Sequence, residues 1–460
     1  MAKKSKAKKK VEKAAKKHPV AALVIILLLA ALCVGGYFAY RFYLEQNPET
    51  SFVLNGPDAY TIAKNSVYEE KGATATYNGK DVSSEIETSY TKDGTPCDTV
   101  ETAVPGVYRV EYAISYEKLE ASLTRLVTVS EYETASFSVS FLELGNKYTG
   151  DSVYIKAGDV DILIDAGSRQ SSASAIGDFL RQPGNVEDNK LEFVIATHAH
   201  QDHIAGFVGT STVPGIFDQF DTGTIIDFAK TDATSSIYSS YVAKRDAEVA
   251  LGATHYTALE CYRESVAGAQ RVYDLAPGIT MEILYHKFYE ETAKGNENDY
   301  SVALLFTQGN NHYLFTGDLE EDGEASLVEK NTLPEVVLFK GAHHGSYTAN
   351  SDALLSVIKP KVVCICCCAG TTEFRPSAGN EFPAQKAIDR LGQYTEKIYV
   401  TSLWDPDSAS GFRSLNGTIT CRSAFGNGLG DFVVHGSVSD TILKETDWFK
   451  ANRTWPSRAS

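Results

Sequence analysis

The chain has 460 residues, of which 43% are hydrophobic and 11% are aromatic, so it can form more than one buried core and is not disordered as a whole. The net charge is −16, but nine lysines and one glutamate give the first eighteen residues +8, which leaves −24 on the remainder. An acidic body of this kind disfavours general binding to nucleic acid backbones, which depends on Lys and Arg, although a small basic groove is still compatible with it.

Residues 20–40 form an apolar stretch without a charged side chain. At a rise of about 1.5 Å per residue, a helix of this length matches the ~30 Å core of a bilayer, which predicts one transmembrane helix. The lysine-rich tail, residues 1–18, places the N-terminus in the cytoplasm and the body outside the cell. A cleaved signal peptide is the alternative, but its apolar core would be only about 7–15 residues long. We therefore expect a single-pass protein anchored in the cytoplasmic membrane.

Residues 51–130 contain strand patterns separated by turn residues. Residues 104–114 alternate apolar and polar side chains after a Pro-Gly turn, and residues 121–129 do the same, which predicts a small β-sandwich. The hairpin followed by a Thr-Val-x-Val ending resembles bacterial immunoglobulin-like repeats. The resemblance implies a stalk or adhesion module that carries no chemistry.

From residue 137 onward, apolar strands alternate with longer amphipathic segments, which predicts an α/β domain over residues 135–445. A helical pattern covers residues 171–181, and a cysteine-rich apolar strand covers residues 362–369, where we expect buried thiols without a redox or metal role. The other expected strands are 138–144, 151–156, 160–165, 193–196, 278–286, 300–306, 311–316 and 335–340. Residues 207–276 are expected to cover the cleft of this domain.

The loop after residue 196 concentrates groups that bind metals. His198 and His200 are two positions apart, so an extended backbone turns both imidazoles the same way. Asp202 and His203 follow where the chain begins to turn, and they can reach a second ion. The loop therefore predicts two half-sites for metal ions.

Three further segments place such groups just beyond a strand: Asp165, Asp318 and the pair His343-His344. Strand ends at one edge of a layered sheet can converge on one cleft, so we expect these residues to meet the histidine loop there.

At this point the sequence resembles the metallo-β-lactamase superfamily, through the His-x-His-x-Asp-His motif at residues 198–203. The resemblance implies a four-layer αβ/βα sandwich with a dinuclear site at one edge. Further motifs resemble the branch that includes the extracellular hydrolase domain of the competence protein ComEC and the phosphorylcholine esterases of Gram-positive cell surfaces. These motifs are Phe141-Leu142-Glu143-Leu144-Gly145, Asp151-Ser152, Asn298-Asp299-Tyr300-Ser301, Thr316-Gly317-Asp318 and His343-His344-Gly345-Ser346.

The resemblance also implies roles for individual residues. One half-site would use His198 and His200, the other Asp202 and His203, with Asp318 bridging the two. One histidine of the pair His343 and His344 would complete the second half-site and the other would contact the substrate phosphate, and spacing leaves open which does which. The residues expected to take part in catalysis are Asp202, Asp318 and His344, those expected to bind substrate are His343 and Ser346, and Asp165 would hold the histidine loop from behind.

One expected ligand is missing, because many members of the superfamily have a further histidine before the bridging aspartate. Only His255, His286 and His312 lie in that interval. His255 and His312 are most simply solvated, whereas His286 ends a strand without the glycine turn that follows the family's ligand. The first half-site is therefore expected to be weaker than the second.

Imidazole and carboxylate ligands without cysteine suit Zn²⁺, with two ions per chain, and Mn²⁺ or iron would suit the same set. Zinc would lower the pKa of a bound water from about 15.7 to about 7, so that a bridging hydroxide becomes the nucleophile. The leading hypothesis is an extracellular, membrane-anchored hydrolase of phosphodiesters, acting on cell-envelope polymers or their choline-type substituents. One alternative is a ComEC-like nuclease, which the −24 body disfavours and which is less secure because Phe382-Pro383 stands where that branch often has a His-Pro pair. The other is a non-catalytic surface binding module.

Overall fold

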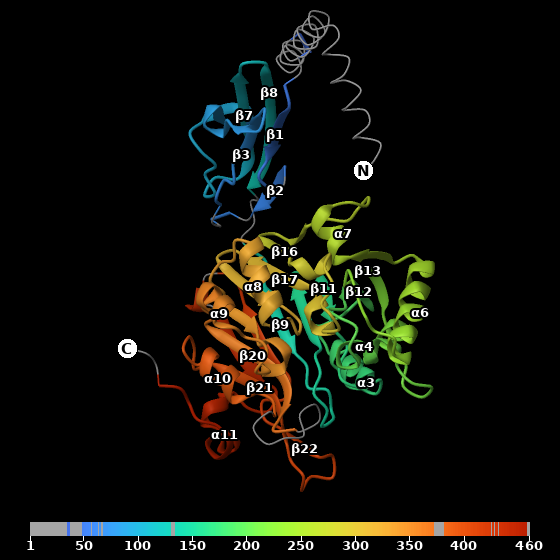
Figure 1. Cartoon of the computed structure of the whole chain (residues 1–460). Helices are drawn as coiled ribbons and strands as arrows, with labels where there is room; N and C mark the ends of the chain where they lie inside the picture. The colour runs from blue at the N-terminus through green and yellow to red at the C-terminus, as the bar shows by residue number, and fades with distance from the viewer. Residues whose placement is uncertain are drawn as a thin grey trace, which may run out of the picture. The chain divides into compact units, whose positions relative to one another are not determined.

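A computed structural model of the chain describes residues 35–36, 48–56, 58–62, 64–65, 68–129, 134–371, 381–424, 426, 428–430 and 432–457 (Figure 1). The basic tail and the predicted membrane span, residues 20–40, lie outside the described residues except for Gly35 and Gly36. Within the described part of the chain, no helix has the length and apolar character needed to span a membrane. The described residues form two compact units, the first within the ranges Met1–Tyr60, Glu69–Val100 and Val107–Val127, and the second within Thr61–Tyr68, Glu101–Gly106 and Thr128–Ser460.

The N-terminal strands form a three-stranded sheet in the order β1-β3-β4 and a five-stranded sheet in the order β2-β8-β7-β5-β6. Alternate residues of β7 are buried, from Tyr108 to Ile114, as its sequence pattern predicts. The two predicted strands are confirmed: β7 starts and ends two residues later than expected, and β8 starts two residues earlier. The strands are β1 Thr50–Leu54, β2 Ala59–Ile62, β3 Ala73–Tyr77, β4 Lys80–Asp81, β5 Ile86–Lys92, β6 Thr95–Cys97, β7 Gly106–Tyr116 and β8 Leu119–Val129, with a 3-10 turn, η1, at Ser83–Glu85.

The second unit contains two eight-stranded sheets. The first has the order β14-β13-β12-β11-β10-β9-β23-β24 and the second the order β15-β16-β17-β18-β19-β20-β21-β22. The strands of the first sheet are β9 Phe137–Phe141, β10 Val153–Ala157, β11 Val160–Ile164, β12 Lys190–Ile195, β13 Asp221–Asp227, β14 Thr254–Thr257, β23 Ile419–Ser423 and β24 Phe432–Gly436. Those of the second are β15 Val272–Ala276, β16 Ile279–Leu284, β17 Ala303–Gln308, β18 Asn311–Phe315, β19 Leu338–Lys340, β20 Val362–Ala369, β21 Ile398–Trp404 and β22 Phe412–Ser414.

The central strands of the second sheet, β17 to β20, are buried on both faces, and their successive side chains join different cores. In β17, Leu304 and Phe306 belong to the core shared with the first sheet, whereas Leu305 belongs to a separate outer core. Phe306 also lies 5.8 Å, between ring centroids, from Phe137 of the first sheet. The two sheets therefore pack face to face, and each needs helices to cover its outer face.

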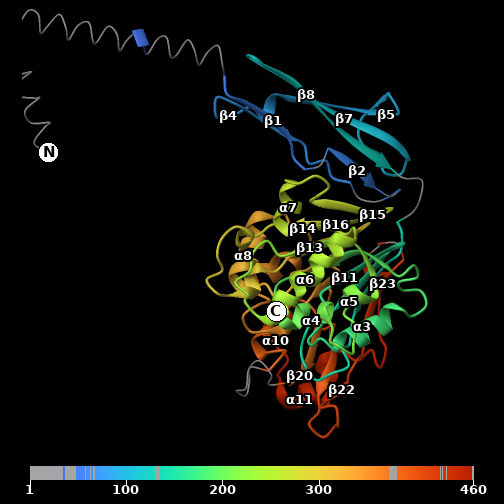
Figure 2. The ribbon, with the colours of Figure 1, turned by 90° about the vertical axis from the view of Figure 1, so that its right-hand side faces the viewer.

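Helices α3 to α6 lie on the outer side of the first sheet and α8 to α10 on the outer side of the second (Figures 1 and 2). Tyr154 of β10 packs edge to face on Phe179 of α3, and Leu327 of α8 and Leu354 of α9 fill the outer core of the second sheet. The mixed α/β prediction is confirmed, with layers in the order helices, sheet, sheet, helices. The helices are α3 Ser172–Leu180, α4 Gln201–Val208, α5 Ile216–Gln219, α6 Ser236–Leu251, α7 Ala258–Arg263, α8 Glu321–Lys330, α9 Asp352–Ile358, α10 Gln385–Leu391 and α11 Asp447–Asn452, with 3-10 turns η2 Lys287–Tyr289, η3 Glu297–Tyr300, η4 Ala342–Gly345, η5 Gly428–Gly430 and η6 Leu443–Glu445.

Two predictions need correction. The strand expected over 300–306 begins only at Ala303, because residues 297–300 form η3 and present side chains to the site. Residues 207–276 do not form a separate cover: they supply β13 and β14 to the first sheet and β15 to the second, with α6 and α7 between them. The strand-like runs in this segment therefore belong to the two sheets, β14 and β15 as edge strands.

The cysteine-rich strand is confirmed as β20, a central strand in which all eight residues are buried. Burial raises the pKa of Cys364, Cys366 and Cys367, which keeps their thiols protonated and unreactive.

Candidate metal centre

The site lies where parallel strands of both sheets end. In the first sheet, β11 is followed by Asp165 and β12 by the histidine loop, and these two strands are parallel neighbours. In the second sheet, β18 leads to Asp318 and β19 leads to His343-His344, and these strands are also parallel neighbours. Neighbouring parallel strands end at the same edge, so each sheet delivers two segments to one place.

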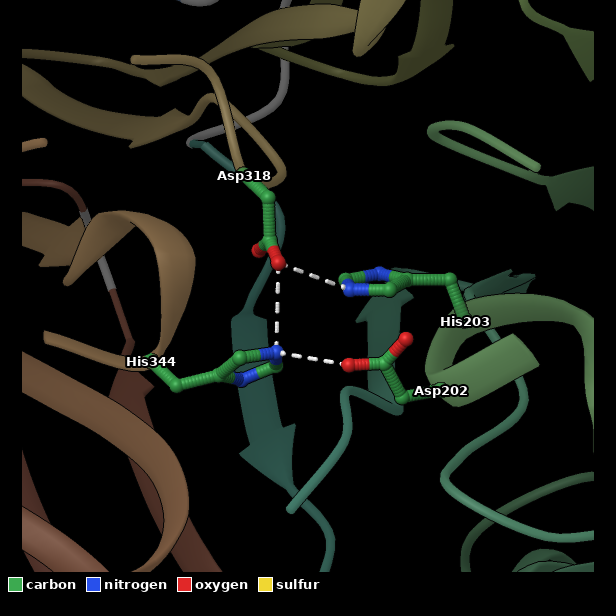
Figure 3. Close-up of side chains that lie close together, drawn as sticks. All are labelled: Asp202, His203, Asp318 and His344. Atoms are coloured by element: carbon green, nitrogen blue, oxygen red, sulfur yellow. Dashed lines mark hydrogen bonds and ion pairs between the residues drawn. The ribbon is translucent and has the colours of Figure 1, made fainter. Parts of the chain in front are cut away.

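Four side chains meet there: Asp202, His203, Asp318 and His344 (Figure 3). Oδ2 of Asp318 lies 3.1 Å from Nε2 of His203 and 3.2 Å from Nε2 of His344, and the same nitrogen of His344 lies 3.3 Å from Oδ2 of Asp202. One ligand atom from each of the four residues lies within 4.8 Å of those of the other three. This group corresponds to the predicted second half-site together with the expected bridging aspartate.

In both imidazoles of the group, Nδ1 lies close to an oxygen acceptor, while Nε2 faces the other members of the group. Nδ1 of His203 lies 2.7 Å from Oδ2 of Asp165, whose two oxygens also accept hydrogen bonds from the backbone N and the Oγ1 of Thr197, both at 2.8 Å. Nδ1 of His344 lies 3.0 Å from the carbonyl oxygen of Cys366 and 3.2 Å from Oδ1 of Asp151. With Nδ1 protonated toward these acceptors, both Nε2 atoms can serve as ligands.

Charges within the group fix its protonation. Burial would raise the pKa of Asp202, but His344, whose Nε2 lies 3.3 Å from Asp202 Oδ2, and the charge of His203 lower that pKa to about 2. Burial would lower the pKa of His203 and His344, but the neighbouring carboxylates, Asp318 foremost and then Asp165 or Asp151, raise both pKa values well above the usual range. The protonated imidazoles of His203 and His344 therefore offset the negative charge of the neighbouring carboxylates. A metal ion that binds here would displace these protons.

The donor set fits a divalent metal. Nε2 of His344 and Oδ1 of Asp318 are buried and make no well-aligned hydrogen bond among the described residues, although carboxylates lie within ion-pair distance of that nitrogen. Buried polar atoms normally have hydrogen-bond partners, and a metal ion bound by this group would give the His344 nitrogen a partner. Two imidazole nitrogens and two carboxylates are the ligand types that zinc accepts, and manganese accepts them as well.

The first half-site is less complete. Nε2 of His198 lies 3.0 Å from Nδ1 of His200, so two imidazole nitrogens could share an ion. His198 is fully buried, and burial together with His203 and His200 holds its pKa well below the usual value. His200 is exposed, however, and Ser301 Oγ lies 3.3 Å from Nδ1 of His198.

None of the three histidines considered as a replacement ligand joins a metal-competent group among the described residues. Nε2 of the buried His286 lies 2.8 Å from the carbonyl oxygen of Ser301, so this side chain fixes the backbone of Ser301, whose hydroxyl contacts His198. His255 is paired with the buried Asp227 at 2.9 Å, and His312 lies 3.1 Å from Thr307 Oγ1. The expectation that His255 and His312 are simply solvated is therefore wrong, because each has a protein partner.

The structure separates the two histidines of the pair. His344 joins the metal-competent group, whereas Nδ1 of His343 lies 3.1 Å from Oε1 of Glu320. Both histidines have a left-handed backbone, with φ values of 46° and 53°, which residues other than glycine rarely adopt, and their ring planes lie at 67° to each other. Ser346 is fully buried with its Oγ 2.8 Å from Thr348 Oγ1, so its role in substrate binding stays a prediction.

Three residues at the site were missed as functional candidates: Asp151, Lys340 and Glu320. Nζ of Lys340, with the side chain 2% exposed, lies 2.5 Å from Asp151 Oδ2 and 3.6 Å from Asp318 Oδ1. A lysine that ends an apolar strand and a motif containing Asp151 were visible in the sequence, but the pairing joins two different sheets. No local pattern reveals such a pair.

Two family models match the chain. Residues 52–129 match "Bacterial surface protein, Ig-like domain", and residues 145–209, which include the histidine loop, match "Metallo-beta-lactamase superfamily".

Two curated relatives share part of the sequence. "Recombination protein 2" of Haemophilus influenzae is 30% identical over 107 residues, which are 23% of this chain and 12% of that protein. "ComE operon protein 3" of Bacillus subtilis is 25% identical over 158 residues, which are 33% of this chain and 17% of that protein. The chain therefore spans less than a fifth of the length of either relative.

Among solved structures, a metallo-β-lactamase from Hirschia baltica is 11% identical to this chain, with 47% of this chain and 68% of that one covered and a TM-score of 0.19. This score is too low to support a shared fold, so the description of the fold rests on the strand order and layers of this chain.

Proposed function

The chain carries a bacterial Ig-like domain followed by a metallo-β-lactamase domain, and on this premise we propose that it is a metal-dependent hydrolase of phosphodiesters. The observation that carries the proposal is the convergence of Asp202, His203, Asp318 and His344 beside a further histidine, His343, that stands outside the group. The four residues suit a metal, and the fifth offers a separate donor for a substrate oxygen.

A bound divalent metal would supply a water that ionises near neutral pH and would neutralise the non-bridging oxygens of a phosphodiester. The metal would be bound by Asp202, Asp318 and His344, with His203 as the fourth ligand. Asp165 and Asp151 would keep the two imidazoles in the tautomer that leaves Nε2 free. His343, whose side chain is 14% exposed, would donate a hydrogen bond to the phosphoryl group.

The remaining parts of the proposal concern location and substrate. Residues 20–40 would anchor the protein in the cytoplasmic membrane, with the Ig-like domain and the hydrolase domain outside the cell. Zinc would be the resident metal there, and cell-envelope phosphodiesters would be the substrates.

A nuclease is the second candidate, because one relative bears the name "Recombination protein 2". The −24 charge outside the first eighteen residues argues against it, since DNA binding is driven by Lys and Arg. Phe382 stands where the ComEC-like branch often has a histidine, which removes one substrate-side donor.

Full-length protein in detergent would be tested for zinc content by mass spectrometry and for turnover of bis(p-nitrophenyl) phosphate, alongside H344A. The proposal expects bound zinc and turnover in the wild type and loss of both in H344A. Zinc without turnover of any diester would favour a binding module, and nicking of plasmid DNA at rates above those for small diesters would favour the nuclease. Hydrolysis of a chromogenic β-lactam in preference to diesters would overturn the proposal.

A further inference from the structure

Lys340 is a buried lysine that lies next to the metal-competent group. It ends β19, its side chain is 2% exposed, and its Nζ lies 2.5 Å from Oδ2 of Asp151 and 3.6 Å from Oδ1 of Asp318. The same ammonium donates a hydrogen bond to the carbonyl oxygen of Gly317 at 2.9 Å. Lys340 therefore contacts both the side chain of Asp318 and the backbone just before it.

Asp151, the partner of this lysine, contacts the other members of the group. Its Oδ1 lies 3.2 Å from Nδ1 of His344, its Oδ2 lies 3.8 Å from Nδ1 of His203, and its backbone N–H donates a hydrogen bond to the carbonyl oxygen of Asp202 at 3.0 Å. One ion pair thus contacts all four residues of the metal-competent group. It also links the two sheets, because the lysine belongs to β19 and the aspartate to the segment before β10.

The charge of Lys340 is matched to several buried carboxylates. Asp151, Asp165 and Asp318 are each 1% exposed, and like charges repel one another strongly where water is excluded. Among the ion pairs of the described residues, Lys340 is the only lysine or arginine that pairs with any of these three. Its ammonium attracts Oδ1 of Asp318, while Oδ2 of that carboxylate faces the two imidazoles of the group.

We propose that Lys340 and Asp151 form a positioning pair that holds Asp318 with Oδ2, and not Oδ1, toward the metal. The proposal rests on the metal binding of the proposed function, but it is independent of the substrate. Without the ammonium, the Asp318 carboxylate is free to turn away from the other ligands. Loss of a residue that orients a ligand typically lowers metal affinity by about 10- to 100-fold.

The first test measures cobalt(II) binding by full-length, metal-free protein in detergent, for the wild type, K340M, D151N and the double variant. We expect K340M to bind cobalt about 10- to 100-fold more weakly and to give a different d–d absorption spectrum, because that spectrum reports the ligand geometry. The double variant should lose no more affinity than the weaker-binding single variant, because the two residues act as a unit.

The matched control is R245M. Arg245 pairs at 2.8 Å with Asp227, which is as buried as Asp151 but lies outside the metal-competent group. R245M should bind cobalt as the wild type does, even where it lowers stability.

Crystal structures of the metal-free wild type and the double variant give a readout that needs no metal. The double variant removes both charges of the pair at once, so it should fold even where K340M, which leaves a buried carboxylate unpaired, does not. We expect Asp318 to turn in the double variant, so that its Oδ2 no longer lies 3.1 Å from Nε2 of His203 and 3.2 Å from Nε2 of His344.

An unchanged position of Asp318 in the double variant would overturn the proposal even if the wild type binds cobalt. Cobalt affinity of K340M within twofold of the wild type, additive losses from K340M and D151N, or an equal loss in R245M would overturn it as well. A wild type that binds no cobalt, together with a turned Asp318 in the double variant, would instead refute the proposed function and leave the positioning role intact.

Discussion

Replacing Asp165 with asparagine tests whether this carboxylate sets up the metal centre. Its two oxygens accept hydrogen bonds from Thr197 N and Thr197 Oγ1, and one of them also accepts from Nδ1 of His203 at 2.7 Å. Asparagine has only one acceptor oxygen, so its NH₂ group must face either the backbone N–H of Thr197 or the imidazole. If the NH₂ group faces the backbone N–H of Thr197, two hydrogen-bond donors face each other. If it faces the imidazole, Nδ1 must accept, and the proton of His203 moves to Nε2, the nitrogen that faces Asp318.

Either arrangement weakens metal binding. Loss of a carboxylate that orients a ligand typically lowers metal affinity by about 10- to 100-fold, which corresponds to about 1.4 to 2.7 kcal/mol. We expect the upper part of this range, because Asp165 is 1% exposed and no water can readily replace the lost acceptor.

The affinity of D165N for Zn²⁺ would be measured by competition with a chromophoric chelator at constant pH. The matched control is D227N, because Asp227 is equally buried and is paired with His255 at 2.9 Å, but it lies outside the metal-competent group. D227N should bind zinc as the wild type does, even where it lowers stability. A D165N affinity within twofold of the wild type would refute the reasoning.

Three further predictions concern stability. Burial lowers the pKa of His286 to about 4, so between pH 6.5 and 4 this side chain is protonated in the unfolded chain but not in the folded one. As the pH drops through this range, the unfolding free energy of the wild type should fall by up to about 3 kcal/mol relative to that of H286Q, measured by urea titration. A Cβ at Gly150 would lie 2.6 Å from the carbonyl oxygen of Asp202, so G150A should cost about 1–3 kcal/mol, measured by thermal melting, and should also lower zinc content. Zinc at about 100 times its Kd should raise the unfolding free energy by about 2.7 kcal/mol, and H344A should abolish this increase.

Local patterns predicted the parts of the fold that depend on one strand or one loop. Alternation located β7, and the apolar run before residue 196 located β12 and the loop that follows it. The cysteine strand was also predictable, because Cys behaves as a small buried side chain whatever its neighbours are.

Features that need contacts between distant segments were not predictable. Lysine is seldom buried, and nothing near Lys340 indicates that Asp151, from the segment before β10, neutralises it. The difference between His343 and His344 depends on two successive left-handed residues, which the His-His-Gly sequence does not specify. The contact between His286 and the carbonyl oxygen of Ser301 likewise depends on the turn made by η3.

The metal-competent group takes Asp202 and His203 from α4, which follows β12 of the first sheet, and Asp318 and His344 from the segments that follow β18 and β19 of the second. An ion bound there would act as a removable cross-link between two layers whose contributing residues lie more than a hundred positions apart in sequence. Separation of the sheets would release the ion, and loss of the ion would remove one tie between the sheets. Metal supply would then govern how long the domain stays folded, in addition to whether it can catalyse a reaction.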